Sequence, residues 1–286
     1  MLERDPSDWT VGRVLRRRIA VGEQPAGAPS AVRPVVHWRR GHGPRDEERG
    51  LVREAPLVIQ LVGHGSFTIM RTPGHDLDLA VGFLLAEGAI EGMGDIVELR
   101  ACEGGDTVKV WLREGLAGTI HRNLVVQSSC GLCGHEDAGA IVSGLDAVCG
   151  GLCVSVDLLY AMPARLRAEQ GLFEQTGGCH AAALFDVDGS IRVLGEDLGR
   201  HSALDKVLGH AARFGVPTAD AGVILSGRTS LEMVVKAVRA RIGLVMAISA
   251  PSDAAVDAAD RLGVTLCGFA RGDEVGVYSH PWRVRG

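Results

Sequence analysis

The last third of the chain shows the clearest alternation of apolar and amphipathic segments. Residues 222–225 and 243–248 are continuous apolar runs, and each precedes a segment with apolar positions at helical spacing. Thr229 and Glu232 are spaced as a capping box, and Ala250-Pro251-Ser252-Asp253 is placed to cap a second helix. Strand and helix alternation predicts parallel pairing with right-handed crossovers. We therefore expect strands at residues 222–225, 243–249 and 264–269, with helices at residues 229–241 and 254–262.

A smaller unit precedes this region. Residues 57–62 and 66–70 are typical of two strands joined by a tight glycine-containing turn. Apolar residues recur at helical spacing between residues 76 and 88, which predicts a helix. Further strands are expected at residues 96–99, 108–112, 124–126, 181–185 and 191–194, and further helices at residues 155–169 and 198–209.

These patterns divide the chain into four parts. Residues 1–50 are rich in proline, arginine and small residues and lack a sustained hydrophobic period, so we expect a mobile basic tail. Residues 51–127 are predicted to form a small α+β domain, and residues 128–153 a flexible loop that carries a C-x-x-C pair. Residues 154–286 are predicted to form an α/β domain. The expected fold class is α/β, with a smaller α+β N-terminal domain.

Composition narrows the class of protein. A chain of 286 residues with 46% hydrophobic and 23% charged content argues against disorder, collagen and small disulfide scaffolds. No apolar stretch approaches the roughly 20 residues that a membrane helix requires. The first six residues show no basic segment followed by an apolar one, so we expect a cytoplasmic protein without a membrane anchor.

Charge is unevenly distributed along the chain. Residues 1–53 contain eleven arginines and seven acidic residues, a net charge of +4, which leaves −9 for the rest. An acidic body argues against nucleic-acid binding, because the neutralisation of many phosphates needs a concentrated basic face.

Cys130-Gly131-Leu132-Cys133 lies in a Gly/Ser-rich stretch and admits three interpretations. The pair could cycle between dithiol and disulfide, although a mid-chain loop is an unusual place for that chemistry. It could join Cys149 and Cys153 in a zinc site, because fifteen residues separate C-x2-C from C-x3-C. Cys130 could also be a mobile nucleophile that accepts sulfur as a persulfide, with Cys133 as its mate.

The other cysteines have apolar or packed neighbours in the sequence. Cys149 and Cys153, if they do not bind zinc, are expected to be two small buried residues. The remaining three, which we expect to be inert core thiols, are Cys102, Cys179 and Cys267.

Two strand-to-helix turns in the last third resemble one another. Ser226 and Ser249 each follow an apolar strand, and a hydroxyl residue stands at the start of the next helix. Such turns direct free backbone N–H groups and hydroxyls beyond the ends of the strands, where open α/β sheets bind ligands. Arg228 adds a forked cation suited to phosphate oxygens. Both interpretations of these turns, helix capping and phosphate binding, remain open.

Six stretches of the chain form an ordered set of motifs between about residue 54 and residue 280. They are Met70-Arg71-Thr72-Pro73, residues 79–88, residues 128–134, residues 176–182, residues 196–206 and residues 225–230. In these stretches the chain resembles the FdhD/NarQ family, the sulfurtransferases that serve formate dehydrogenase maturation.

The resemblance implies that a cysteine desulfurase hands sulfur to Cys130, which passes it to the bis(molybdopterin guanine dinucleotide) form of the molybdenum cofactor before insertion into formate dehydrogenase. Cys133 matches the second cysteine of the family pair. A guanine nucleotide should mimic the cofactor, and no resident metal is implied. The family's cofactor-binding stretch corresponds to Phe269, Ala270, Arg271, Gly272, Asp273 and Glu274.

The resemblance also implies a cytidine-deaminase-like, three-layer C-terminal domain and a homodimer. Deaminase activity itself is excluded, because a working deaminase needs a glutamate two residues after its zinc-binding histidine, and Ala182 occupies that position after His180. His180 is interpreted equally well as a structural residue or a cofactor contact. We expect His201 to contact the cofactor and Asp205, four residues later, to anchor its helix internally.

Two other functions remain as alternatives. A cofactor-binding chaperone would hold the same ligand without transferring sulfur, and Cys130 would then be only a protective thiol. A zinc-stabilised cysteine-cluster protein would use the four clustered cysteines as metal ligands.

Overall fold

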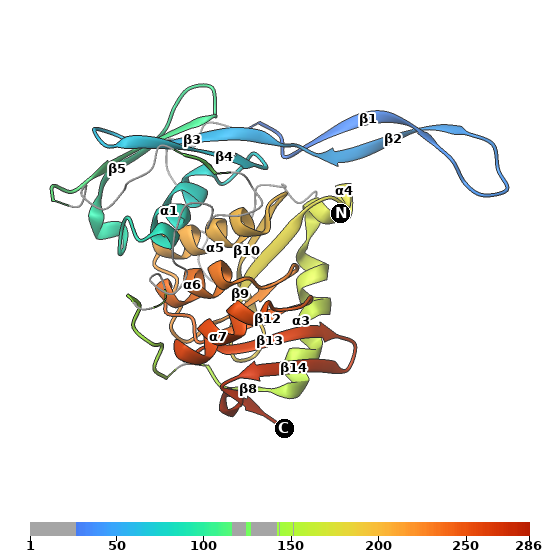
Figure 1. The fold of residues 1–286 in the computed structure, drawn as a ribbon. Coiled ribbons are helices and arrows are strands. Elements are labelled where there is room, and N and C mark those ends of the chain that lie inside the picture. The colour runs from blue at the N-terminus through green and yellow to red at the C-terminus, as the bar shows by residue number, and fades with distance from the viewer. Residues whose placement is uncertain (1–26, 116–123, 127–141, 143, 151) are drawn as a thin grey trace.

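The computed structural model describes residues 27–115, 124–126, 142, 144–150 and 152–286, and Figure 1 shows its fold. Its largest element is a six-stranded sheet with the order β10-β9-β11-β12-β13-β14. The strands are β9 (His180–Phe185), β10 (Ile191–Asp197), β11 (Gly222–Leu225), β12 (Leu244–Ala247), β13 (Thr265–Arg271) and β14 (Glu274–Ser279).

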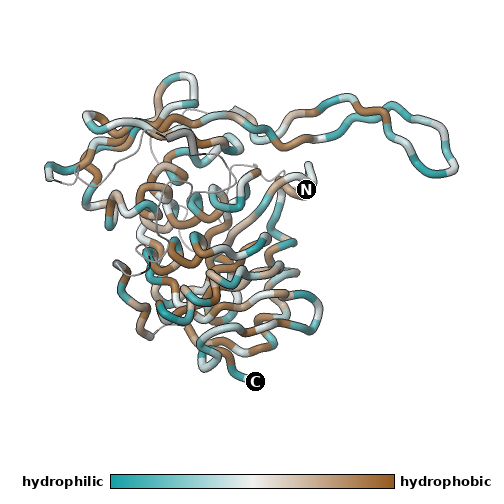
Figure 2. The backbone as a smooth tube through the Cα atoms, viewed as in Figure 1, coloured by the Kyte–Doolittle hydropathy of each residue, from teal (hydrophilic) through white to brown (hydrophobic). Residues whose placement is uncertain are grey.

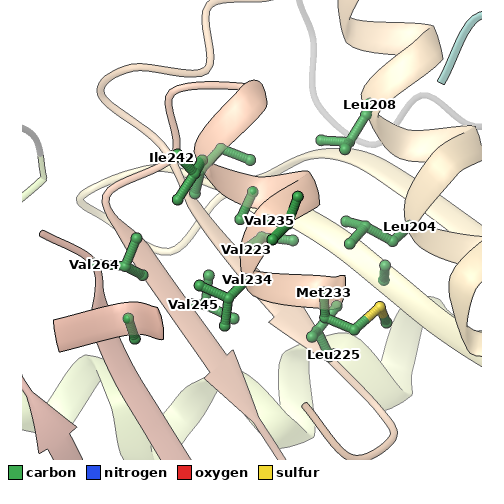
Figure 3. Packing of buried hydrophobic residues seen from close by; sticks show 14 of the residues in the cluster. Leu204, Leu208, Val223, Leu225, Met233, Val234, Val235, Ile242, Val245 and Val264 are labelled. Atoms are coloured by element: carbon green, nitrogen blue, oxygen red, sulfur yellow. The ribbon is translucent and has the colours of Figure 1, made fainter. Parts of the chain in front are cut away.

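Helices cover both faces of this sheet. Along β11, Val223 and Leu225 pack into a core shared with α5, α6 and α7, whereas Ile224 packs on the opposite face with α3. Figure 3 shows side chains of the first core between α6 and the strands beneath it. The domain therefore has three layers. The helices are α3 (Val156–Glu169), α5 (Arg200–Phe214), α6 (Leu231–Arg239) and α7 (Asp253–Arg261).

The predicted parallel arrangement is confirmed for three neighbouring strands. β11 pairs with β12 and β12 with β13, both in parallel, while β9, β10 and β14 run antiparallel to their neighbours. The predicted cap at Ser252 is also confirmed, since its Oγ accepts a hydrogen bond from the N–H of Ala255 at 3.2 Å. The predicted capping box is wrong, because Ser230 is the N-cap of α6 and makes no side-chain cap bond.

The smaller unit is a five-stranded sheet with the order β5-β6-β3-β4-β7. The hairpin and helix predicted for it are present. Its elements are β3 (Ala55–Leu61), β4 (Gly65–Arg71), α1 (Asp76–Glu87), η1 (Met93–Asp95), β5 (Ile96–Ala101), β6 (Thr107–Leu112) and β7 (Leu124–Val126).

The two units meet where α1 crosses α5. A Cβ on Gly82 would lie 1.8 Å from the backbone oxygen of Asp205, and one on Gly209 would lie 1.8 Å from that of Asp78. Only glycine allows the two helix backbones to approach so closely. The contact joins the small sheet to the helical layer of the large one.

Residues 30–52 differ from the expected tail. Strands β1 (Ser30–His37) and β2 (Arg45–Val52) form an antiparallel ribbon that projects from the body (Figure 1). The tail prediction is corrected for this part, because cross-strand pairing orders a segment whose side chains are mostly exposed and which therefore lacks a buried periodic face. Residues 1–26 lie outside the described part of the chain.

A few short elements complete the described structure, and none of its helices is long and apolar enough to span a membrane. These elements are β8 (Val154–Ser155), α4 (Gly171–Thr176), η3 (Pro281–Arg283) and β15 (Val284–Arg285).

Candidate functional site

Most of the predicted binding residues lie at one edge of the large sheet, where β10, β11, β12 and β13 end and β9 begins. We call this region, around His180, Asp197, Ser226, Ser249 and Phe269, the strand-end edge. The strand register explains the grouping: Leu225 at the end of β11 pairs with Ala182 of β9 and Ala247 of β12. Residues just beyond these positions are therefore neighbours in space.

His180 and Ser226 are in contact at this edge. The Oγ of Ser226 accepts a hydrogen bond from the N–H of Ala181 at 2.9 Å and lies 3.3 Å from Nδ1 of His180. Burial, together with the nearby charge of Arg200, lowers the pKa of His180 below its ordinary value. The imidazole is therefore held in its neutral form, which can both donate and accept a hydrogen bond.

The two turns that the sequence suggested as phosphate sites interlock. The N–H of Thr229 donates to the oxygen of Ala250 at 3.2 Å, and the N–H of Ser252 donates to the oxygen of Thr229 at 2.9 Å. The N–H of Phe269 donates to the oxygen of Ser249 at 3.1 Å. These bonds bring the segments after β11, β12 and β13 into one continuous surface.

Three polar atoms at the strand-end edge are buried without a hydrogen-bond partner among the described residues: Thr229 Oγ1, Ser230 Oγ and Arg200 Nε. Thr229 is only 1% exposed. A buried polar group without a partner costs about 1–3 kcal/mol, so such groups point to a ligand that supplies the missing bonds. Arg228 is exposed beside them. Two hydroxyls, two guanidinium groups and the start of α6 suit the oxygens of a phosphate.

The segment from Phe269 to Glu274 forms the hairpin between β13 and β14. All of its residues except Ala270 are exposed. Phe269 has φ 52°, a left-handed conformation that costs energy for a bulky residue and is typical of functional positions. The guanidinium of Arg271 lies 5.6 Å from the centre of the Phe269 ring. An aromatic ring and a cation are thus presented together at the edge.

His201 lies in the first turn of α5 and is buried. Its Nε2 is 3.1 Å from Oε2 of Glu232 on α6. Asp205 is paired with Lys236 instead of His201, and the Nζ of Lys236 lies 2.7 Å from both carboxylate oxygens. Burial raises the pKa of Asp205 to about 6, although Lys236 opposes the shift. Asp205 is therefore an internal link between α5 and α6.

One contact that sequence reasoning missed joins the small unit to the strand-end edge. The N–H of Thr72, just after β4, donates to Oδ2 of Asp197 at 3.0 Å, and its Oγ1 accepts from the N–H of Leu198 at 3.0 Å. The Nζ of Lys206 lies 2.8 Å from Asp197 and donates to the oxygen of Thr72 at 2.9 Å. The chain has only three lysines, and this scarcity was the one sequence signal that could have singled out Lys206.

Cys130 and Cys133, the predicted sulfur-carrying pair, lie outside the described residues. The last described residue before them is Val126, which pairs with Ile69 of β4 in a parallel ladder. Ile69 precedes Thr72 by three positions and the pairing is parallel, so β7 ends on the same side of the small sheet as the Thr72 contact.

The remaining cysteines differ in burial, and Cys102, which was also expected to be a core thiol, is only half-buried. Cys179 and Cys267 are buried, as predicted for core thiols; burial raises the pKa of both, to about 12 for Cys267, and Glu196 adds to the effect on Cys179. Cys149 was expected to be buried if it does not bind zinc, but it is exposed, and Cys153 is half-buried. The turn at Gly150, whose oxygen accepts two hydrogen bonds from Arg283, directs Cys149 outward. Within the described residues, no three potential metal ligands come together.

Comparisons with known proteins agree with one another. The model of the FdhD/NarQ family matches residues 52–285. A protein of Nocardia farcinica named "Sulfur carrier protein FdhD" is 41% identical over 285 residues, covering 96% of each chain. A protein of the same name from Mycolicibacterium paratuberculosis is 40% identical over 266 residues, covering 88% of this chain and 97% of its own.

A solved structure shares the fold. A protein from Desulfotalea psychrophila, described as a formate dehydrogenase accessory protein, superposes with a TM-score of 0.72 at 24% sequence identity. The alignment covers 90% of this chain and 99% of that one. The mixed α/β architecture is therefore shared over nearly the whole of both chains.

Proposed function

Because this chain belongs to the FdhD/NarQ family, we propose that it is a sulfur carrier that takes part in the maturation of formate dehydrogenase. In this proposal a cysteine desulfurase loads a persulfide on Cys130, and the sulfur passes to a molybdenum cofactor with two guanine dinucleotide arms. The loaded cofactor is then delivered to formate dehydrogenase. The names of the relatives support the sulfur-carrying part.

The observation that carries the proposal for the ligand is the set of unpartnered polar atoms at the strand-end edge. Arg200, Thr229 and Ser230 offer buried donors with no acceptor among the described residues. A cofactor with two dinucleotide arms carries several phosphates, which are strong acceptors for such donors. Ser226, Arg228 and Ser249 lie on the same surface and extend the set that would hold phosphate.

The remaining predicted contacts fit the other parts of a nucleotide. The exposed ring of Phe269 provides a face on which a guanine can stack, and Arg271 lies beside it. His180, held neutral by burial, can donate or accept a hydrogen bond at a sugar or base. His201, also predicted to contact the cofactor, has its Nε2 3.1 Å from Oε2 of Glu232, and we assign it the role of positioning the start of α5.

Chain geometry supports Cys130 as the thiol that reaches this ligand. Three residues separate Val126 from Cys130, and the four residue steps between them span at most about 14 Å when extended. Val126 lies opposite Ile69, and the nearby Thr72 is bonded to Asp197 at the strand-end edge. The end of β7 and the strand-end edge are thus linked through β4, which supports Cys130 as the carrier for a ligand bound at the edge.

The transfer proceeds in two steps. The thiolate of Cys130 attacks the outer sulfur of the desulfurase persulfide; a new sulfur–sulfur bond forms, and the desulfurase cysteine leaves as a thiolate. In the second step the bound substrate supplies an electron pair to the outer sulfur and forms a bond to it, while the bond between Cys130 and that sulfur breaks. Cys130 leaves as a thiolate, and the substrate is oxidised by two electrons as it gains the sulfur. Cys133 is placed to shield or resolve the persulfide, since it is three residues away.

Replacement of the carrier thiol tests the proposal. A Cys130→Ala variant should still bind a guanine nucleotide but should fail to activate formate dehydrogenase, whereas the matched Cys149→Ala variant should activate it normally. If Cys130→Ala activates the enzyme as well as wild type does, the protein is a cofactor-binding chaperone. Near-stoichiometric zinc that is lost in Cys149→Ala would instead favour the zinc-stabilised cysteine cluster.

The proposal has two structural corollaries. The three-layer domain is expected to resemble the cytidine-deaminase fold, with Ala182 in place of the catalytic glutamate. The protein is also expected to act as a homodimer in the cytoplasm, so that two copies of the strand-end edge receive the two dinucleotide arms. Sedimentation of the protein with and without a guanine nucleotide would measure the oligomeric state.

A further inference from the structure

The ribbon of β1 and β2 is exposed along most of its length. Its two strands pair only with each other within the described structure, which leaves both outer edges unpaired. In Figure 1 the ribbon extends well beyond the body of the molecule. An isolated two-stranded ribbon is at best marginally stable in water. The exposure of the ribbon and its unpaired edges therefore suggest that another molecule covers it.

One face of the ribbon combines an apolar row on β1 with two carboxylates on β2, because Asp46 and Glu48 lie opposite Val36 and Pro34. Val32 and Val36 are 61% and 53% exposed, and Trp38, just beyond the end of β1, is 71% exposed. Figure 2 shows hydrophobic stretches along the ribbon. Aligned apolar side chains on an exposed element are typical of protein–protein contact surfaces.

Positive charge gathers toward the tip of the ribbon. Glu47 is already engaged by His37 and Arg49, at 3.1 and 2.8 Å. The ribbon cations for which no ion pair is found within the described part of the chain are Arg39, Arg40 and Arg45 at the tip and Arg33 farther along β1. These four cations outnumber Asp46 and Glu48, so the ribbon favours an acidic partner surface.

The two faces of the ribbon differ in charge. The strand register places Arg33 and Arg45 on the face opposite to the one that carries Asp46 and Glu48. A protein surface with an apolar patch and acidic groups complements both features of the ribbon.

The root of the ribbon lies beside the strand-end edge. A Cβ on Gly50 of β2 would lie 2.7 Å from the backbone oxygen of Gln175 in α4, so the strand is packed tightly against that helix. A Cβ on Gly178 would lie 3.2 Å from Val52, at the end of β2. Gly178 precedes His180 by two residues. A protein bound along the ribbon is therefore held next to the proposed cofactor site.

We propose that the ribbon is a docking arm for an acidic protein surface, and that its occupant is the enzyme that receives the cofactor. This inference rests on the proposed function. A large anionic ligand at the strand-end edge can be handed over without release into solvent only to a protein docked at that edge. The sulfur donor, in contrast, needs access only to the segment that carries Cys130.

The test is a binding measurement with the full-length protein and purified formate dehydrogenase that lacks its cofactor, from the same organism. Arg39→Glu combined with Arg40→Glu should weaken binding at least about tenfold, and the wild-type affinity should fall with rising salt. The matched control, Arg261→Glu with Arg285→Glu, makes the same change in charge at exposed positions away from the ribbon and should change the affinity less than twofold. Trp38→Ala should weaken binding without any change in charge.

Several outcomes would overturn the docking proposal. Unchanged affinity of the Arg39→Glu, Arg40→Glu variant would exclude the ribbon tip. Loss of binding to the desulfurase alone, or to a duplex DNA or transfer RNA probe alone, would assign the ribbon to a different partner. Cys130→Ala should bind the enzyme as wild type does, because it leaves the ribbon intact. The two proposals can therefore fail independently. Full activation of formate dehydrogenase by Cys130→Ala would refute sulfur transfer by Cys130, whereas the binding measurements alone decide whether the ribbon is the docking arm.

Discussion

Thr72 and Asp197 join the two units of the molecule: the backbone N–H of Thr72 donates to the Asp197 carboxylate at 3.0 Å, across 125 positions of sequence. Lys206 completes the arrangement, with its Nζ 2.8 Å from the same carboxylate. Asp197 and Lys206 are 0% and 2% exposed. A buried ion pair thus holds the end of β4, beside the end of β7, against the strand-end edge.

Asp197→Asn should destabilise the fold strongly. The substitution removes the negative charge that compensates Lys206, and an unpaired buried charge costs about 3–5 kcal/mol. Denaturant unfolding should show this loss as a lower free energy of unfolding. Asp257→Asn, at an exposed position on α7, is the control and should remain within about 0.5 kcal/mol of wild type. Equal stability of the two variants would show that the pair does not hold the units together.

Gly82→Ala should disrupt the crossing of α1 and α5. The added Cβ would meet the backbone oxygen of Asp205 at 1.8 Å, so one helix must move. We expect a loss of about 3 kcal/mol or more, measured by thermal unfolding. Gly171→Ala places a Cβ in open space and should be nearly neutral. A Gly82→Ala variant as stable as the control would mean that the helices are not so closely packed in solution.

Acidification should weaken the fold through His75. Burial lowers the pKa of His75 from 6.5 to about 4. Between these values the unfolded chain binds a proton that the folded protein does not, so the unfolding free energy falls as the pH falls from 6.5 to 4. The full effect is about 3 kcal/mol.

The matched variant for this effect is His75→Asn. Asparagine tolerates the left-handed backbone at this position, where φ is 58°, and it does not titrate. The difference in stability between wild type and variant should shrink as the pH falls through this window. Asp205 is present in both proteins, so its contribution to the pH dependence of stability drops out of the difference. A difference that does not depend on pH would rule out the proposed origin in His75.

Thiol reactivity should separate the cysteines by burial. Cys149 is exposed and should react readily with iodoacetamide in the native protein. Cys267 is buried, and its pKa is raised to about 12, so almost none of it is thiolate at neutral pH. Peptide mass spectrometry should find Cys149 labelled and Cys267 unlabelled until the protein is denatured. Rapid labelling of native Cys267 would contradict the described packing.

The regular elements of the last third could be predicted because burial imposes a period on them. Val223 and Ile224 face opposite helical layers, which is why the strand is apolar throughout. The order of the strands could not be predicted, since pairing such as Leu225 with Ala182 depends on long-range packing. The β1–β2 ribbon was missed because an element without a buried face leaves no hydrophobic period in the sequence.

The grouping of the candidate binding residues was easier to predict than their contacts. Ser226, Ser249 and Phe269 were proposed from turns and family motifs, and strand register brings their segments together. The actual neighbours of His201 and Asp205 are Glu232 and Lys236 on α6. Helical spacing within α5 could not reveal them, because the contacts cross between helices.

The most direct test of the central claim is mass spectrometry of the protein after incubation with a cysteine desulfurase and cysteine. A gain of one sulfur, about 32 mass units, should appear on the peptide that contains Cys130 and should be lost after reduction. Cys130→Ala should show no gain, and Cys149→Ala should show the same gain as wild type. Absence of the adduct from wild type, or its appearance on Cys149 instead, would contradict the proposal that Cys130 carries the sulfur.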